Sequence, residues 1–199
     1  MTGAFNMTLN AYEGEGSSEV VVPEGVREIA PRAFRRHREI EHVELPESLE
    51  IIGDEAFAGC SGLREIILPS ALCELGQRTF RNCSGLKRAV VPAGLEVIPE
   101  GAFSLCAQLE EVLGGAGVYG ICTEAFAGCK ALRVCEPLAY AVDVGDRAFN
   151  WCVQLPSPEF PQEMVYIGSC AFRHCVGFQD FSLPERVGYL ADDAFVGCF

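Results

Sequence analysis

The sequence predicts an α/β fold, a solenoid of about eight stacked coils that are each 23 residues long, with a parallel sheet and short helical turns. Three regularities predict it. A phenylalanine recurs every 23 residues, a cysteine usually follows it three residues later, and a short apolar stretch that commonly ends in proline comes next. A fixed period of about 20 to 50 residues is typical of repeat proteins, whose units become stable only by stacking on their neighbours.

The phenylalanines define the period without a single slip. They are Phe34, Phe57, Phe80, Phe103, Phe126, Phe149, Phe172 and Phe195. Alanine precedes each of them except Phe80, which follows Thr79. No 23-residue unit can bury its own phenylalanine and leucines, so the sequence predicts that stacked units bury these side chains in one continuous core.

The cysteines follow the same period. Seven of the eleven lie three residues after a phenylalanine, and His37 takes that place in the first copy: Cys60, Cys83, Cys106, Cys129, Cys152, Cys175 and Cys198. One interpretation is a metal or redox array, because neighbouring thiolates are good soft ligands. The other, which we favour, is a small buried side chain that fills the same slot in every coil. The odd number of cysteines and the absence of a CxxC motif favour free, reduced thiols.

Each repeat also contains two short extended segments. In the pattern Leu63-x-x-Ile66-x-Leu68 the apolar residues face one way, and Pro69 ends the strand because it cannot donate to a ladder. A second apolar pair, Leu72 with Leu75, forms the other segment. The stretch from residue 54 to residue 60, DEAFAGC, favours a single helical turn because it begins with acidic residues and has glycine near its end.

These motifs resemble the BspA-like leucine-rich repeats, also called the Treponema pallidum type. The resemblance covers the chain from about Val20 to its last residue. Two motifs carry it, A-F-x-x-C-x-x-L at Ala56, Phe57, Cys60 and Leu63, and L-P-x-x-L-x-x-I-G at Leu45, Pro46, Leu49, Ile52 and Gly53. The resemblance implies a right-handed solenoid that uses a parallel sheet for protein–protein contact. Many members of the family are surface or secreted adhesin-like proteins.

The two ends of the chain differ from the repeat. Residues 1–18 lack it and are predicted to form an N-terminal flank or cap, and residues 19–199 form the solenoid. The first residues have neither a basic segment nor a long apolar run, which predicts a cytoplasmic protein. The alternative is an exported adhesin or host-interaction protein, secreted or at the cell surface, whose targeting segment belongs to a longer precursor. The repeat stops one residue after Cys198, which predicts an exposed apolar C-terminal end. This end either mediates self-association or marks a fragment of a longer protein.

Three repeats are irregular in their strand segment. The fourth reads LGGAG from Leu113 to Gly117, Pro137 interrupts the fifth, and Pro156 and Pro158 interrupt the sixth. Since proline removes ladder donors, the sheet is predicted to fray or kink between Gly114 and Phe160. This irregularity is either tolerated drift of the repeat or a shaped binding notch.

The charge and the scarcity of histidine limit the function. A net charge of −13 disfavours nucleic acid and anionic membranes and favours a basic or neutral partner. The three histidines, His37, His42 and His174, do not assemble with a nucleophile and oxyanion donors outside the repeated positions. The sequence therefore predicts no enzyme, with no catalytic residues, no cofactor and no metal.

The candidate site is the set of strand positions that alternate with the apolar ones and so face outward. These positions vary while the scaffold stays constant, with basic residues in the middle beside a small apolar stripe. The predicted partner-binding residues are Glu41, Glu44, Arg64, Glu65, Ile67, Lys87, Arg88, Val90, Glu110, Glu111, Leu113 and Arg133. Charges around an apolar strip suit a protein or peptide partner. The alternative is an ordinary solvated sheet face.

Overall fold

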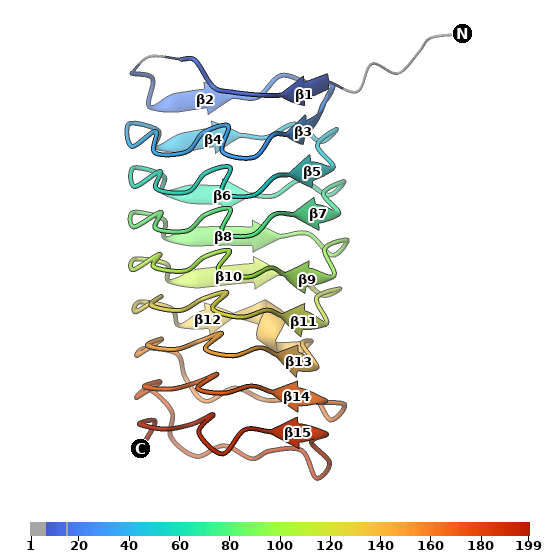
Figure 1. The fold of residues 1–199 in the computed structure, drawn as a ribbon, viewed down its shortest axis with the longest axis vertical. Coiled ribbons are helices and arrows are strands. Elements are labelled where there is room, and N and C mark those ends of the chain that lie inside the picture. Colours follow the sequence, from blue (N-terminus) through green and yellow to red (C-terminus); the bar gives the residue numbers. More distant parts are fainter. Residues whose placement is uncertain (1–6, 15) are drawn as a thin grey trace, which may run out of the picture.

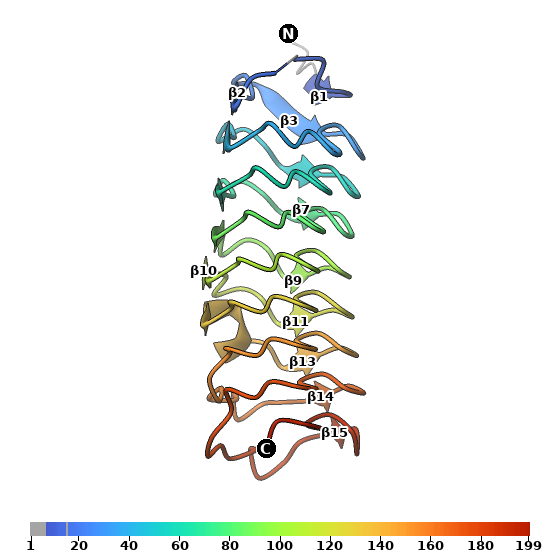
Figure 2. The ribbon, with the colours of Figure 1, turned by 90° about the vertical axis from the view of Figure 1, so that its left-hand side faces the viewer.

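A computed structural model describes residues 7–14 and 16–199 as a stack of about eight coils wound around one axis, with β1 at one end of the stack and β15 at the other (Figures 1 and 2). The predicted solenoid is therefore confirmed. Each coil has three sides, and in the regular coils each side is held to the next coil by backbone hydrogen bonds. Part of the predicted flank, residues 1–6 and 15, lies outside the described residues.

The first side carries the candidate site, and we call it the strand face. Its parallel strands are β2 (Glu19–Val21), β4 (His42–Glu44), β6 (Glu65–Ile67), β8 (Arg88–Val91), β10 (Glu111–Gly114) and β12 (Val134–Cys135). The middle residue of each strand points into the core, so that Ile66, Ala89 and Val112 are fully buried. Strands β2 and β4 form one small sheet, and β6, β8, β10 and β12 form another. The sheet is therefore broken between β4 and β6.

The second side is also made of parallel strands, which are shorter. They are β1 (Met7–Leu9), β3 (Val26–Ile29), β5 (Ile51–Ile52), β7 (Glu74–Leu75), β9 (Val97–Ile98), β11 (Gly120–Ile121), β13 (Asp143–Val144), β14 (Tyr166–Ile167) and β15 (Tyr189–Leu190). The second residue of each pair faces the core, as with Ile52, Ile98 and Ile167, which are fully buried. Strand β1 pairs with β3, so residues before the first full repeat join this side.

The third side, which we call the turn face, replaces the expected helical turn with a ladder of turns. The amides of Ala56, Ala58 and Cys60 bond within their own coil, to carbonyls three residues earlier. The amides between them donate to the next coil: Glu55 N to Gln77 O at 2.8 Å, Phe57 N to Thr79 O at 2.9 Å, and Gly59 N to Arg81 O at 2.8 Å. Glu55 and Gly59 reach this arrangement with positive φ angles of 55° and 79°. Among the described residues the only helix is the short 3-10 segment η1 (Glu136–Ala139).

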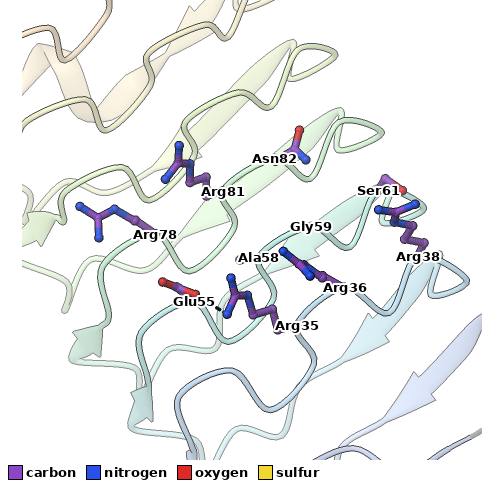
Figure 3. Close-up of a pocket in the computed structure, with 10 residues that line it drawn as sticks. All are labelled: Arg35, Arg36, Arg38, Glu55, Ala58, Gly59, Ser61, Arg78, Arg81 and Asn82. Atoms are coloured by element: carbon purple, nitrogen blue, oxygen red, sulfur yellow. Dashed lines mark ion pairs between the residues drawn. The ribbon is translucent and has the colours of Figure 1, made fainter.

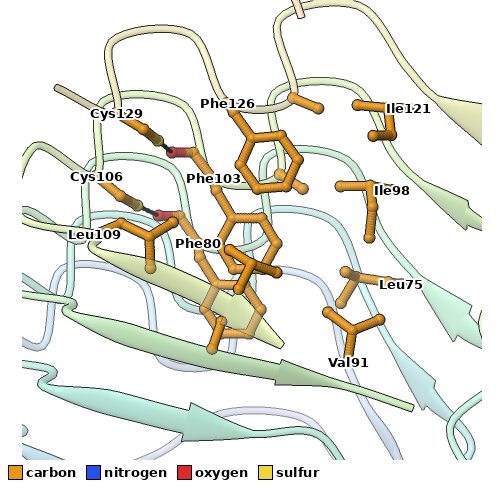
Figure 4. Packing of buried hydrophobic residues seen from close by; sticks show 14 of the residues in the cluster. Leu75, Phe80, Val91, Ile98, Phe103, Cys106, Leu109, Ile121, Phe126 and Cys129 are labelled. Atoms are coloured by element: carbon orange, nitrogen blue, oxygen red, sulfur yellow. Dashed lines mark hydrogen bonds between the residues drawn. The ribbon is translucent and has the colours of Figure 1, made fainter. Parts of the chain in front are cut away.

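The eight phenylalanines form a single stack through the centre of the solenoid (Figure 4 shows three of them). Neighbouring ring centroids lie between 4.7 and 5.4 Å apart, and the ring planes differ by at most 16°. The rings from Phe34 to Phe172 are fully buried. Tyr12 extends the stack at the N-terminal end, with its ring centroid 5.1 Å from that of Phe34.

The repeated cysteines hydrogen bond to the coil before them (Figure 4). Each thiol donates to the carbonyl of the preceding coil's phenylalanine, as Cys106 Sγ does to Phe80 O at 3.1 Å. The six other repeated cysteines make the same bond at 2.9 to 3.2 Å. That carbonyl also accepts the amide of the cysteine in its own coil, as Phe80 O does from Cys83 N at 3.1 Å. The thiol therefore occupies the second lone pair of a buried carbonyl, and all eleven cysteines are free.

The strand face ends before the C-terminal end of the stack. Strand β12 has two residues and runs directly into η1 at Glu136, and the corresponding segments of the next two coils, 154–161 and 178–184, contain no strand. Pro156 and Pro158 explain the loss in the first segment, since each removes a ladder donor. The second segment contains only Pro184, at the position that Pro69 takes after an intact strand, and this segment has no neighbouring strand to pair with. The interruption differs from the expected range, because Gly114 still pairs with Val91 and the strands stop only after Cys135.

We expect Phe103→Ala to lower the free energy of unfolding by about 3 to 5 kcal/mol, because it removes a buried ring from the middle of the stack. Urea denaturation followed by circular dichroism measures the change. Leu105→Ala is the matched control, since Leu105 is 46% exposed two residues away and its loss should cost under about 1 kcal/mol. Equal losses for the two variants would contradict a stack-dependent core.

We expect the thiols to react with a disulfide reagent at pH 8 in two widely separated phases. Cys73 is exposed and should react rapidly. Burial raises the pKa of Cys83, Cys106, Cys129 and Cys152, so their thiolates are scarce at this pH and their reaction should wait for unfolding. Cys73→Ser should remove rapid labelling at that site. Fast reaction of these four cysteines in the native protein would contradict the arrangement.

Candidate functional site

The structure brings the predicted partner-binding residues together as three rows that run along the strand face, across the strands. The first row precedes the strands and contains Glu41, Arg64, Lys87, Glu110 and Arg133. The second contains His42, Glu65, Arg88, Glu111 and Val134. The third contains Glu44, Ile67, Val90, Leu113 and Glu136. Backbone bonds hold neighbours in register, as with Lys87 N to Arg64 O at 2.8 Å and the pairing of Ile67 with Val90.

The first row supplies most of the free positive charge. Arg64 and Lys87 are adjacent and exposed, and within the described residues neither forms an ion pair. Glu110 follows them, and Arg133 donates from Nε to Gln154 Oε1 at 2.7 Å. Two neighbouring cations in the middle of a row form the point on this face that would attract an anionic group of a partner.

In the second row the single arginine is paired with two glutamates. Arg88 bonds to Glu65 through Nη1 and lies 3.0 Å from Glu111 Oε1 through Nε, so one guanidinium bridges two strands. All three side chains are about 40% exposed. Such exposed pairs contribute little to stability, on the order of 0 to 1 kcal/mol each. Because these pairs engage its guanidinium group, Arg88 is less available to a partner than the sequence pattern suggests.

The third row is the apolar one. Ile67 is 55% exposed, and Val90 and Leu113 are partly buried beside it. Acidic residues stand at both ends of the row, Glu44 on β4 and Glu136 after β12. The Glu136 carboxylate accepts a hydrogen bond from Gly114 N at 2.5 Å, which ties that end to the sheet. The row is thus a short apolar stripe with an acidic group at each end.

A hollow lies at the break between β4 and β6. It has a volume of about 270 Å³, and its lining combines acidic and apolar side chains: His42, Val43, Glu44, Leu45, Glu47, Glu65, Ile67 and Pro69. Three of the predicted residues, Glu44, Glu65 and Ile67, meet in it. Glu47 and Pro69 also line it and were missed, because the sequence pattern places them after the strands and does not reveal where the sheet breaks.

Two further histidines, His37 and His174, lie outside the strand face. His37 Nδ1 lies 2.8 Å from Glu39 Oε1, and this contact, together with a backbone hydrogen bond, holds the pKa of Glu39 below its usual value. The ring of His174 packs on Trp151 with centroids 4.2 Å apart. In residues 7–14 and 16–199 no three His, Cys, Asp or Glu side chains are placed to hold a metal ion. In the same residues no helix has the length and apolar character needed to span a bilayer.

Coils of this length, with a parallel strand face and a buried leucine and phenylalanine core, define a leucine-rich-repeat solenoid. The chain belongs to the BspA type leucine rich repeat family, whose sequence pattern matches residues 6–133 and 142–199 in six copies. The family expected from the motifs is therefore confirmed. No curated protein matches the chain.

Solved structures of bacterial repeat proteins are similar to this one. A leucine-rich repeat protein from Eubacterium ventriosum superposes with a TM-score of 0.78 at 23% identity, over 89% of this chain and 48% of that one. The chain therefore spans about half the length of the Eubacterium protein. The T. pallidum leucine-rich repeat protein superposes with a TM-score of 0.66 at 29% identity, over 75% of this chain and 82% of that one.

A third similar structure belongs to a protein that is described as a cell surface protein. It is a leucine-rich cell surface protein from Faecalibacterium prausnitzii, with a TM-score of 0.50 and 19% identity over 100% of this chain and 84% of that one. At this identity the similarity shows a shared fold and nothing about shared residues in the rows of the strand face.

Proposed function

We propose that the chain is a non-enzymatic interaction module whose strand face binds a protein or a peptide segment. The observation that carries this proposal is the apolar stripe of Ile67, Val90 and Leu113, which is held in register beside two free cations and opens into the hollow at the sheet break. An apolar centre with a charged rim is the usual composition of a protein interface.

The charges suggest how the partner is oriented. The hollow contributes Glu44, Glu47 and Glu65, and these carboxylates favour a lysine or arginine of the partner beside an apolar side chain that covers Ile67. The neighbouring Arg64 and Lys87 favour an acidic group one row away. A segment with an apolar residue between a basic and an acidic one fits both requirements.

The cellular location of the protein is also part of this proposal. A cytoplasmic module is the simpler assignment from the sequence, and a surface-exposed or host-interaction role is the second candidate. The second candidate is supported by the similarity to the Faecalibacterium protein, which is described as a cell surface protein. Labelling of intact source cells with an antibody against the solenoid distinguishes the two, since the antibody reaches the protein on intact cells only if it lies at the surface.

We expect Ile67→Asp to weaken partner binding by a factor of about 30 or more, because it puts a charge at the centre of the apolar stripe. The partner is first captured from the source organism and identified by mass spectrometry, then purified and titrated by calorimetry. Val165→Asp is the matched control, since Val165 is equally exposed at 55% but lies outside the strand face. Equal binding by both variants would remove the strand face as the site.

We also propose that the C-terminal coil mediates self-association. Its apolar side chains include Phe199, 83% exposed and stacked on Phe181 at 5.9 Å, and Val196. Within the described residues the amides of Asp193, Phe195 and Gly197 have no backbone acceptor. A second molecule that covers this end would bury the rings and give these donors partners.

Sedimentation equilibrium should then show a concentration-dependent dimer for the protein, and a monomer for Phe199→Asp at the same concentrations, because the charge blocks burial of the apolar end. Val21→Asp is a suitable control, since Val21 is an exposed apolar residue near the other end of the stack. A monomer at all concentrations for the unmodified protein would refute the self-association.

A further inference from the structure

The turn face holds a basic groove that the strand-face function does not use (Figure 3). The groove has a volume of about 500 Å³. Arg35, Arg36 and Arg38 of the first coil form one wall, and Arg78 and Arg81 of the third coil form the other. The turn of the second coil lies between them, so the two walls are two coil spacings apart, or roughly 10 Å.

Side-chain size creates the groove. The second coil has Ala58 and Gly59 at the positions where the first has Arg35 and Arg36, so its backbone forms a recessed floor. A Cβ atom added at Gly59 would lie 3.3 Å from Cγ of Arg36, and φ there is 79°. Any larger residue would therefore fill the groove and strain the turn. Arginine, small residue and arginine alternate from coil to coil, which gives two walls and a floor.

The groove carries a surplus of positive charge in an acidic protein. Six of the fifteen basic residues of the chain lie in or beside it, since Arg32 adjoins the first wall. Within the described residues Arg36, Arg38 and Arg81 form no ion pair. Two glutamates oppose the six arginines: Glu100 bonds to Arg78, and Glu55 stands between the walls.

Glu55 leaves most N–H donors of the neighbouring Arg32 and Arg35 without an acceptor. Its Oε2 atom lies 3.3 Å from Arg32 Nε and 3.2 Å from Arg35 Nη1, yet it is buried and forms no hydrogen bond. Each guanidinium group has five N–H donors, and Glu55 contacts one nitrogen of each. The other donors stay available to another acceptor in the groove.

The backbone also accommodates arginine at some cost. Arg32, Arg36 and Arg78 have φ angles of 65°, 67° and 55°, in the left-handed region where an L-residue is strained. Glycine occupies the position equivalent to Arg36 in the second, fifth and eighth coils, at Gly59, Gly128 and Gly197. The same position holds Leu105, Trp151 and His174 in other coils, also with positive φ, so this strain belongs to the repeat and the charge of the side chains is what distinguishes the groove.

We propose that this groove binds a small molecule that carries two or more phosphate groups. A guanidinium group donates two parallel hydrogen bonds to an oxyanion, and a tetrahedral anion presents oxygens toward both walls at once. A carboxylate has only two oxygens, in one plane and with a single charge, so it fills fewer of the donors of the two walls. A phosphate group also carries nearly two charges at neutral pH, which matches the surplus of arginines better than the single charge of a sulfate ester.

The net charge of −13 does not prevent this binding. At physiological ionic strength the screening length is about 8 Å, so most of the distant carboxylates are screened while the groove arginines act at contact distance. The dependence on salt provides one check, because binding that rests on arginine contacts should weaken steadily as sodium chloride is raised.

The test is calorimetric titration of the 199-residue protein with inorganic tripolyphosphate and pyrophosphate. We expect saturable binding of one tripolyphosphate per chain, with pyrophosphate weaker. The double variant Arg36→Asn/Arg81→Gln should lose at least about tenfold in affinity, since two charge-assisted contacts are removed. Asparagine suits the positive φ of Arg36, so the turn should keep its shape.

The matched control is Arg147→Asn/Arg173→Gln. Arg147 also has a positive φ, of 55°, and Arg173 directly follows its phenylalanine as Arg81 does, so the control removes the same two charges from coils far from the groove. We expect its affinity for tripolyphosphate to stay within about twofold of the unmodified protein. Glu55→Gln should bind more tightly, because it removes the anion that stands between the walls.

Three outcomes would overturn the proposal. The first is the absence of saturable tripolyphosphate binding. The second is an equal loss of affinity in the groove variant and the control, which would mean attraction by overall charge. The third is equal or tighter binding of a sulfated disaccharide or a glutamate-rich peptide, which would assign the groove to sulfate or carboxylate ligands.

Discussion

Registration of the phenylalanine stack is the constraint on which the rest of the structure depends. The rings lie about 5 Å apart and nearly parallel, so every coil must return the chain to the same position after each circuit. One added residue would turn all later side chains away from their partners. This explains why the 23-residue period never slips, even in the repeats whose strand has been lost. The repeat therefore tolerates substitutions, even at inward positions such as Ile66, Ala89 and Val112, but not insertions.

The cysteines follow from the same registration. A phenylalanine carbonyl in the core has two lone pairs, of which its own coil's cysteine amide uses one and the next coil's thiol uses the other. The first coil is the exception, because it has no cysteine at this position. No repeated phenylalanine precedes Phe34, so a thiol at position 37 would have no such carbonyl to bond, and His37 stands there against Tyr12 instead.

The sequence was sufficient for the fold because the core depends on spacing, and spacing is visible in the residues. It predicted the Phe57 stack, the buried Ile66 positions and the family, and the positions of Ile67 and Lys87 on one face followed from alternation. It was insufficient for the turn face. There DEAFAGC forms bonds to the next coil in place of a helical turn, because Glu55 and Gly59 take the left-handed conformation. Glycine recurring two residues after phenylalanine was the signal.

The sequence also could not separate the charges of the two faces, for a physical reason. The net charge is a sum over surfaces that contact different ligands. Within a row, an ion pair with the residue one coil away can also neutralise a charge. Arg88 and Arg81 have the same formal charge, yet Arg88 lies between two carboxylates whereas Arg81 opens into a groove without an ion pair. Only the coil geometry distinguishes them, since their neighbours are 23 residues away along the chain. A constant backbone thus lets single outward substitutions build an acidic hollow on one side of the first coils and a basic groove on another. The two sites then attract ligands of opposite charge.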